Sequence, residues 1–87
     1  MKQVNVRFFG AFRSYIPTGE SIVTLEHPMS TKEFKNLIQM HLEKQCGFTN
    51  TLLIEESAIA NDQRVLTETD LIDGTSMICL LPPVCGG

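Results

Sequence analysis

The stretch QVNVRFFG, residues 3–10, shows the clearest strand pattern in the first half of the sequence. Val4, Val6 and Phe8 alternate with polar residues, which is typical of a strand with one buried face. A glycine ends the pattern. The β-branched run SIVTLE, residues 21–26, predicts a second strand, so that the two form a hairpin with a long connection.

A helix is predicted to begin after residue 30. Ser30 and Glu33 match the S-x-x-E capping box, and Met29 and Phe34 occupy the positions of a hydrophobic staple. The apolar residues that follow have the spacing of one helix face, and the helix is expected to end near residues 46–47. These apolar residues are Phe34, Leu37, Ile38 and Leu42.

The second half of the sequence predicts further strands. LLIEESAIA, residues 52–60, and QRVL, residues 63–66, flank a turn and predict another hairpin. Residues 70–74 are interpreted as a helical turn closed by a glycine, and residues 75–81 as the final strand.

The predicted order is β-β-α-β-β-β, an α+β arrangement in which one main helix covers one face of a mixed sheet. That order is the β-grasp, the ubiquitin-like architecture. The first and last strands are expected to lie side by side and parallel at the centre of the sheet. We predict a β-grasp domain over residues 1–81 and an extended C-terminal tail over residues 82–87, which leaves the sheet where the first strand also ends.

Length and composition fit one small globular domain of 87 residues, 43% of them apolar. The start MKQVNVRFF does not resemble a secretory signal, and no apolar run approaches the roughly 20 residues that span a bilayer. We therefore expect a cytoplasmic protein that binds no membrane. Three cysteines without C-x-x-C spacing, together with two histidines, predict no metal site.

The net charge of −3 is unevenly distributed. Residues 1–44 contain six Lys/Arg and four Asp/Glu, whereas residues 45–87 contain one Arg and six Asp/Glu, a net charge of −5. This distribution disfavours nucleic acid, whose phosphates need basic side chains, and suits either a basic protein partner or solubility alone.

The last six residues, PPVCGG, are unusual after an apolar strand. Pro82 and Pro83 lack N–H groups and cannot continue a strand ladder, so they direct the chain away from the sheet. Six extended residues reach at most ~20 Å, far enough to enter the active site of a neighbouring protein. Gly86 and Gly87 have no Cβ, so a terminal carboxylate there can pass through a narrow channel.

A terminal carboxylate has to be activated before it reacts, for example as an acyl-adenylate. Sulfide or a persulfide would then give a thiocarboxylate, whereas a thiol followed by a lysine amine would give an isopeptide bond. The sequence shows no P-loop, no G-x-G-x-x-G and no nucleophile–base pair. His41 is interpreted as a residue at the edge of the core with a backbone partner. We therefore expect a carried substrate with no catalytic residues of its own and no bound cofactor.

Four segments resemble the sulfur-carrier β-grasp family: VRFFGAFR at 6–13, AND at 60–62, LIDGT at 71–75 and LLPPVCGG at 80–87. The Pro-Pro-x-x-Gly-Gly end after an apolar strand is the most specific part. It is typical of the branch that contains the small subunit of molybdopterin synthase, and the resemblance to the thiamin-pathway sulfur carrier is more distant.

The resemblance implies a reaction cycle with several partners. A ubiquitin-activating-type adenylyltransferase would adenylate Gly87 with ATP and magnesium, and a sulfurtransferase or cysteine desulfurase would supply sulfur for a thiocarboxylate. The tail would then enter the large catalytic subunit of molybdopterin synthase, within a heterotetramer. There the sulfur would pass to cyclic pyranopterin monophosphate in molybdenum cofactor biosynthesis.

The resemblance also assigns partner-binding residues by position. Phe9 at the end of the first strand, Arg13 after it and Leu81 before the prolines would dock the large subunit. Cys85 stands where the family more often has Ser or Thr. The remaining partner-binding residues are those of the tail: Pro82, Pro83, Val84 and Cys85.

Three alternatives stay open from the sequence. The first is a carrier for thiamin, cysteine or another sulfur metabolite, and the second is a ubiquitin-like modifier conjugated to lysines through Gly87. The third is a β-grasp interaction module with an inert tail. Thr75-Ser76 replaces an acidic pair of the family, which bears on the identity of the partner more than on the fold.

Overall fold

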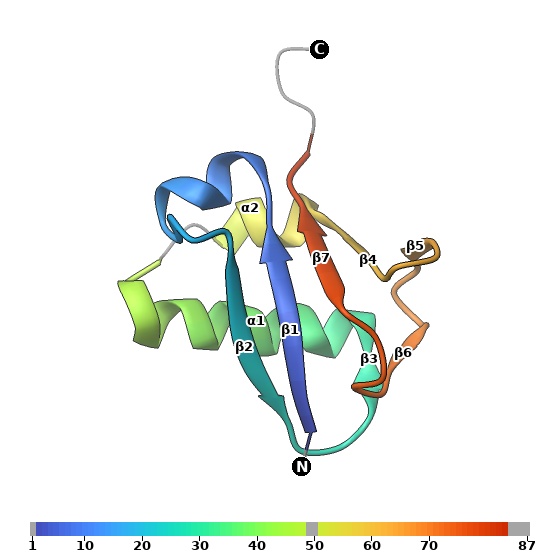
Figure 1. Ribbon diagram of the computed structural model, residues 1–87. Coiled ribbons are helices and arrows are strands. Elements are labelled where there is room, and N and C mark those ends of the chain that lie inside the picture. The colour runs from blue at the N-terminus through green and yellow to red at the C-terminus, as the bar shows by residue number, and fades with distance from the viewer. Residues whose placement is uncertain (1, 49–50, 84–87) are drawn as a thin grey trace.

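The structure, a computed structural model, describes residues 2–48 and 51–83 (Figure 1). One main helix lies behind a twisted sheet in the view of Figure 1. The elements in chain order are β1 (Lys2–Phe8), the 3₁₀ helix η1 (Gly10–Ser14), β2 (Glu20–Leu25), β3 (Met29–Ser30), α1 (Thr31–Cys46), α2 (Thr51–Glu56), β4 (Ala58–Ala60), β5 (Val65–Leu66), β6 (Leu71–Ile72) and β7 (Ile78–Leu81).

A mixed five-stranded sheet forms one layer, in the order β2-β1-β7-β4-β5. β1 pairs with β7 in parallel, with Val6 opposite Ile78 and Phe8 opposite Leu80. The other pairs of this sheet are antiparallel, and β3 and β6 form a separate two-stranded ladder. The predicted mixed sheet, with its first and last strands parallel and adjacent, is therefore confirmed.

The core lies between α1 and one face of the sheet. Val4, Val6 and Phe8 of β1 are at most 1% exposed, as their alternation predicts. The helix residues at positions 34, 38 and 42 are equally buried and belong to the same cluster. Phe12 of η1 joins this cluster, with its ring centroid 5.9 Å from that of Phe8 and 6.0 Å from that of Phe48. Each such side chain contributes roughly 1.5–3 kcal/mol by its burial.

The predicted ends of α1 are confirmed by its caps. Ser30 is the N-cap, and its Oγ accepts a hydrogen bond of 3.2 Å from the N–H of Glu33. A cap of this kind typically contributes about 1 kcal/mol. Gly47 is the C-cap, with a φ of 69° in the left-handed region that favours glycine, and its N–H donates to the carbonyl of Glu43 at 3.1 Å.

The strand predicted over residues 52–60 is wrong in its first half, which forms α2, and only its last three residues form β4. The segment before β4 consists mostly of Leu and Glu, which favour a helix over a strand. α2 buries Ile54 in the core, and Lys35 Nζ of α1 donates to the carbonyl of Glu55 at 3.1 Å. The predicted hairpin is confirmed, because β4 pairs antiparallel with β5.

The helical turn predicted over residues 70–74 is also wrong. Leu71–Ile72 forms β6 instead, and Ile72 pairs with Met29 of β3 directly before α1. Two residues are too short a strand to show a period in the sequence, and the pairing joins segments about 40 residues apart. The final strand is shorter than predicted, because the turn that follows Asp73 occupies its first positions.

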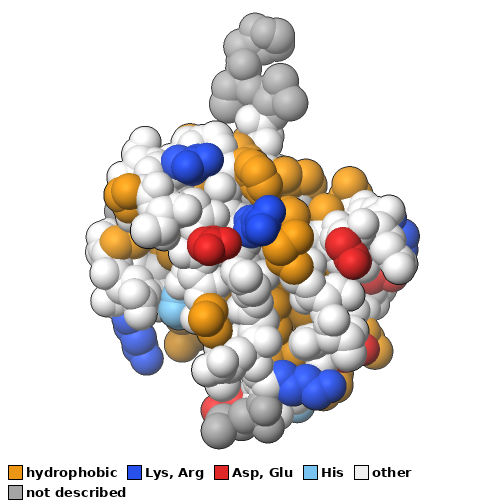
Figure 2. Space-filling model, in the orientation of Figure 1, with side chains coloured by type: hydrophobic (Ala, Val, Ile, Leu, Met, Phe, Trp, Pro, Cys, Tyr) orange, Lys and Arg blue, Asp and Glu red, His pale blue; other side chains and the backbone are white. Residues whose placement is uncertain are grey.

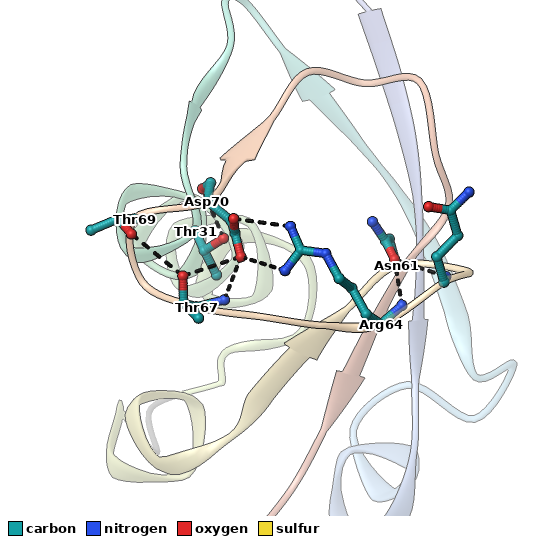
Figure 3. Close-up of polar contacts among 7 residues, drawn as sticks. Thr31, Asn61, Arg64, Thr67, Thr69 and Asp70 are labelled. Atoms are coloured by element: carbon teal, nitrogen blue, oxygen red, sulfur yellow. Dashed lines mark hydrogen bonds and ion pairs between the residues drawn. The ribbon is translucent and has the colours of Figure 1, made fainter.

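A polar loop connects β5 with β6 (Figure 3). Arg64 and Asp70 form a bidentate pair with N–O distances of 2.9 and 3.0 Å. Asp70 Oδ2 also accepts from the backbone N–H of Thr67 at 2.8 Å and from its hydroxyl at 3.1 Å. The carbonyl of Asp70 accepts from the N–H and hydroxyl of Thr31 at 2.9 and 3.0 Å. Asp70 thus joins this loop to the first residue of α1.

Hydrogen bonds from Arg64 and then from Thr67 hold the pKa of Asp70 well below its usual range. The folded state therefore binds this proton more weakly than the unfolded state does. The stabilisation is fully present above the ordinary carboxyl pKa of about 4 and is lost as the pH falls through the folded-state value.

We expect Asp70→Asn to lower the thermal midpoint by a few degrees at pH 7, because the Arg64 pair is lost. The deficit should shrink as the pH falls below about 4, where the unfolded chain already protonates the carboxyl. Circular dichroism melts measure both, with Asp62→Asn in the exposed turn before β5 as the control. An equal deficit at pH 7 and pH 3 contradicts this role.

Candidate functional site at the carboxyl ends of β1 and β7

β1 and β7 run in the same direction, so both end at one edge of the sheet (Figure 1). β1 ends at Phe8 and β7 ends at Leu81, and Pro82 and Pro83 follow directly. Because neither proline has an N–H, the ladder of β7 cannot continue through them. The chain therefore leaves the sheet beside the end of β1, as the sequence predicts.

Pro82, the first residue of the tail, packs closely against Gly10, which lies just after the end of β1. The φ of Gly10 is 60°, and a Cβ built on this glycine would lie 2.6 Å from Cγ of Pro82. A side chain here would meet both the strain of a positive φ and a collision with the proline ring. Glycine is thus required at this position, and the contact fixes the place at which the tail begins.

The open face of the sheet, opposite α1, is apolar beside this exit. In β7, Ile78 and Leu80 are buried toward the helix, so Cys79 and Leu81 face outward. Phe9 stays extended after β1, with φ −126° and ψ 162°, and so continues the alternation of that strand. It faces outward next to β7 and is 39% exposed.

Two alanines of β4 border this apolar area: Ala58 is partly exposed, whereas Ala60 is only 8% exposed. The register places Ala58 beside Leu81 and Ala60 beside Cys79. Figure 2 shows hydrophobic side chains running down this face from the base of the tail. We call this group the exit patch; its members are Phe9, Ala58, Ala60, Cys79 and Leu81.

Two arginines flank the exit patch on the side of η1. Arg7, Phe9, Arg13 and Glu20 line one shallow hollow. Arg7 Nε lies 3.8 Å from Glu20 Oε2, and both side chains are 52% exposed, so this pair contributes little to stability. An exposed aromatic beside arginines is typical of protein interfaces. This corner favours acidic groups of a partner, so a basic partner surface would have to meet the molecule elsewhere.

The structure brings together the described members of the predicted site. They are Phe9, Arg13, Leu81, Pro82 and Pro83, all at this edge. Val84, Cys85, Gly86 and Gly87 lie outside the described residues. The role of Gly10 was not predicted from the sequence, in which this glycine only ends a strand pattern. The parallel pairing of the first and last strands is the signal that brings residue 10 to residue 82.

His41 has a partner that the sequence analysis did not assign. Its Nε2 lies 2.8 Å from Oγ of Ser21 in β2, so the predicted backbone partner is wrong. Partial burial lowers the pKa of His41, which favours the neutral imidazole. The contact is a hydroxyl–imidazole pair that sequence spacing does not reveal. We interpret it as a hydrogen bond that links β2 to α1, away from the exit patch.

Residues 2–48 and 51–83 contain neither a membrane-spanning helix nor a cluster of metal ligands. No helix in these ranges is long and apolar enough to cross a bilayer. No group of three or more His, Cys, Asp or Glu side chains in them gathers as metal ligands would. Cys46 and Cys79 are free thiols.

A curated relative shows the family of this chain, and solved structures show its fold. No family model matches the sequence. A curated relative, the molybdopterin synthase sulfur carrier subunit of Synechococcus elongatus, is 30% identical over 81 residues, which cover 91% of this chain and 90% of that protein.

Solved structures show the same fold. SAMP1 from Haloferax volcanii superposes with a TM-score of 0.68 at 11% identity, over 98% of this chain and 99% of that one. A Pyrococcus furiosus protein named as molybdopterin converting factor, subunit 1, gives a TM-score of 0.67 at 16% identity, over 97% and 100%. These likenesses confirm the predicted ubiquitin-like β-grasp fold.

Gly10→Ala should lower the free energy of unfolding by about 2–3 kcal/mol, because it adds a collision with Pro82 to the strain of a positive φ. Gly47→Ala is the matched control: its φ is 69°, but among the described residues no atom beyond its chain neighbours lies within 4 Å of the added Cβ. It should cost about 1–2 kcal/mol from backbone strain alone. Urea denaturation measures both variants.

The contact itself is tested in a Pro82→Ala background, where the proline Cγ is absent. There the cost of Gly10→Ala should fall to that of the Gly47 control. A cost that is the same in both backgrounds would show that Gly10 and Pro82 are not coupled.

Proposed function

The chain belongs to the family of molybdopterin synthase sulfur carrier subunits, and on that premise we propose that it carries sulfur as a thiocarboxylate on Gly87. The sulfur is donated to cyclic pyranopterin monophosphate in molybdenum cofactor biosynthesis. The observation that carries the proposal is the meeting of Gly10, Pro82 and the exit patch at one edge of the sheet. At that edge, the surface that we propose for docking lies beside the two prolines that begin the tail.

The chemistry starts from an unreactive carboxylate. A ubiquitin-activating-type adenylyltransferase, using ATP and magnesium, converts the Gly87 carboxylate to an acyl-adenylate and releases pyrophosphate. A sulfurtransferase or cysteine desulfurase carries the sulfur as a persulfide, and its terminal sulfur attacks the acyl carbon and displaces AMP. A thiol then cleaves the S–S bond of the resulting acyl disulfide, which releases the enzyme's cysteine as a mixed disulfide. The product is a thiocarboxylate at the end of the tail.

Transfer takes place in the large catalytic subunit of molybdopterin synthase. The thiocarboxylate sulfur bonds to a carbon of the precursor and displaces an oxygen substituent from that carbon. Water then cleaves the bond between the sulfur and the acyl carbon. Gly87 returns as a carboxylate and can be charged again. A dithiolene contains two sulfurs, so each molybdopterin consumes two charged carriers.

The composition of the tail suits entry into an enclosed site. Ordering six residues costs roughly 6–12 kcal/mol, and prolines lower that cost by restricting the unbound chain. Pro82 and Pro83 make up the stiff start of the tail. Val84 and Cys85 follow and would contact the walls of the partner's channel. Gly86 and Gly87 pass the narrowest point because they carry no side chain.

The docking surface offsets the cost of ordering the tail. Phe9 and Leu81 supply exposed or half-exposed apolar area in the exit patch. Arg13 lies beside Phe9 and offers a cation to the rim of the interface. Docking at this patch holds the tail at the entrance of the catalytic subunit.

Intact mass spectrometry of the protein from its native cells tests the proposal. We expect a fraction of molecules with one sulfur-for-oxygen exchange, mapped by fragmentation to Gly87. A chain lacking Gly86 and Gly87 is the control and should show no exchange and no function. Conjugates to lysines of other proteins would identify a modifier instead, and full function of the truncated chain would refute both roles.

A second test concerns docking. Phe9→Ala should weaken binding to the large subunit about tenfold or more, as expected for an aromatic anchor, and leave the thermal midpoint nearly unchanged. Leu71→Ala, which removes an equally apolar but distant side chain that is 70% exposed, is the matched control. Calorimetric titration measures both variants. Equal affinities of the two variants for the large subunit would remove Phe9 from the interface.

A further inference from the structure

The end of β7 is held by the strands on both of its sides. Leu80 lies opposite Phe8 of β1 and opposite Ile59 of β4. The next residue, Leu81, lies opposite Ala58 at the start of β4. Because two neighbouring strands pair with β7 up to its last residues, the sheet fixes the point from which the tail starts.

Pro82 then limits the direction in which the chain continues. Its ring restricts its own φ to about −65°. The three atoms nearest to a Cβ built on Gly10 all belong to this ring, at 2.6, 3.6 and 3.9 Å. The ring therefore packs directly against the backbone of Gly10, which follows β1 in the chain. The first residue of the tail is thus bounded by the end of β1 as well as by its own ring.

A side chain at residue 10 would change the path of the tail. The ring of a proline is joined to its own backbone nitrogen, so it cannot swing away from an added Cβ as a long side chain can. Gly19 provides a contrast. The atoms nearest to a Cβ there belong to the end of the Arg13 side chain, the closest at 3.3 Å, and that end can move aside. At residue 10 the backbone of Pro82 itself has to shift.

We propose that Gly10 is a positioning residue for sulfur transfer, because the space that it leaves for the Pro82 ring sets the direction in which the tail departs from the exit patch. This inference rests on the proposed sulfur-carrier function. The large subunit docks on the exit patch, so the direction at Pro82 decides where the reactive end arrives in that subunit. A displacement of about 1 Å at a reacting group can lower a rate by up to about 100-fold.

Docking and positioning are separable at this edge. The exit patch presents side chains such as Phe9 and Leu81 on the open face of the sheet. Gly10 has no side chain and adds no apolar area to that patch. A change at residue 10 therefore moves the start of the tail and leaves the docking area in place. It should affect the rate of transfer within the complex, and not the affinity of the complex.

The test is single-turnover sulfur transfer from the full chain, prepared with a thiocarboxylate at Gly87, to cyclic pyranopterin monophosphate on an excess of the large subunit. Gly10→Ala should lower the maximal rate about tenfold or more and change the half-saturating concentration of the large subunit less than about twofold. Gly47→Ala is the matched control, because it has the same kind of backbone strain away from Pro82, and it should keep both values. Circular dichroism verifies that both variants are folded at the assay temperature.

A second variant and a structural measurement test the contact itself. Pro82→Ala removes the ring, so in that background Gly10→Ala should lower the maximal rate no further. A nuclear Overhauser effect between the α protons of Gly10 and the ring protons of Pro82 reports the contact without any chemistry. It should be present in the free chain and persist when the large subunit is bound.

Four results overturn the positioning role of Gly10. They are an unchanged maximal rate in Gly10→Ala, an equal loss of rate in Gly47→Ala, a further loss in the Pro82→Ala background, and no Overhauser effect between Gly10 and Pro82. In each case the wild-type chain still transfers sulfur, so the proposed function stands. No transfer from the wild-type chain refutes the proposed function, and this inference with it.

Discussion

The parallel pairing of β1 with β7 is the contact on which the rest of the structure depends. Parallel strands need a long crossover, and here α1, α2 and the smaller strands all lie between the two partners in the chain. Because the two strands point the same way, they end at the same edge. The distance between residues 10 and 82 is therefore set by the fold, and not by the tail.

Alternation along these two strands places core residues on one face of the sheet and exposed residues on the other. Phe8 and Leu80 point toward α1 and are at most 1% exposed, whereas Phe9 and Leu81 point outward beside the exit. One residue step thus separates a core position from a position on the open face, where we propose that a partner docks. Gly10 completes the arrangement, since its missing side chain leaves the space that Pro82 occupies. The chain in this way leaves the sheet at Pro82 next to an exposed apolar surface.

Local signals predicted β1, β2 and α1 well, because period and capping are written in neighbouring residues, such as Ser30 and Glu33. The prediction was wrong at two short elements. The Leu- and Glu-rich run that was predicted as a strand follows its local helix preference and forms α2, which buries Ile54. β6 depends instead on a tertiary contact, the pairing of Ile72 with Met29. Phe9, Arg13 and Leu81 came from a family resemblance. No local sequence pattern predicts that Ala58 and Ala60 border the exit patch or that Gly10 contacts Pro82. These arrangements depend on the register between strands that are distant in the sequence.

Sulfur transfer in a purified system tests the central claim most directly. The chain, prepared with a thiocarboxylate at Gly87, is mixed with the large catalytic subunit and cyclic pyranopterin monophosphate, and both molybdopterin and carrier mass are measured. The account predicts molybdopterin, with two carriers returned to the carboxylate form for each product. A large subunit that makes molybdopterin with another carrier but none with this thiocarboxylated chain would contradict it.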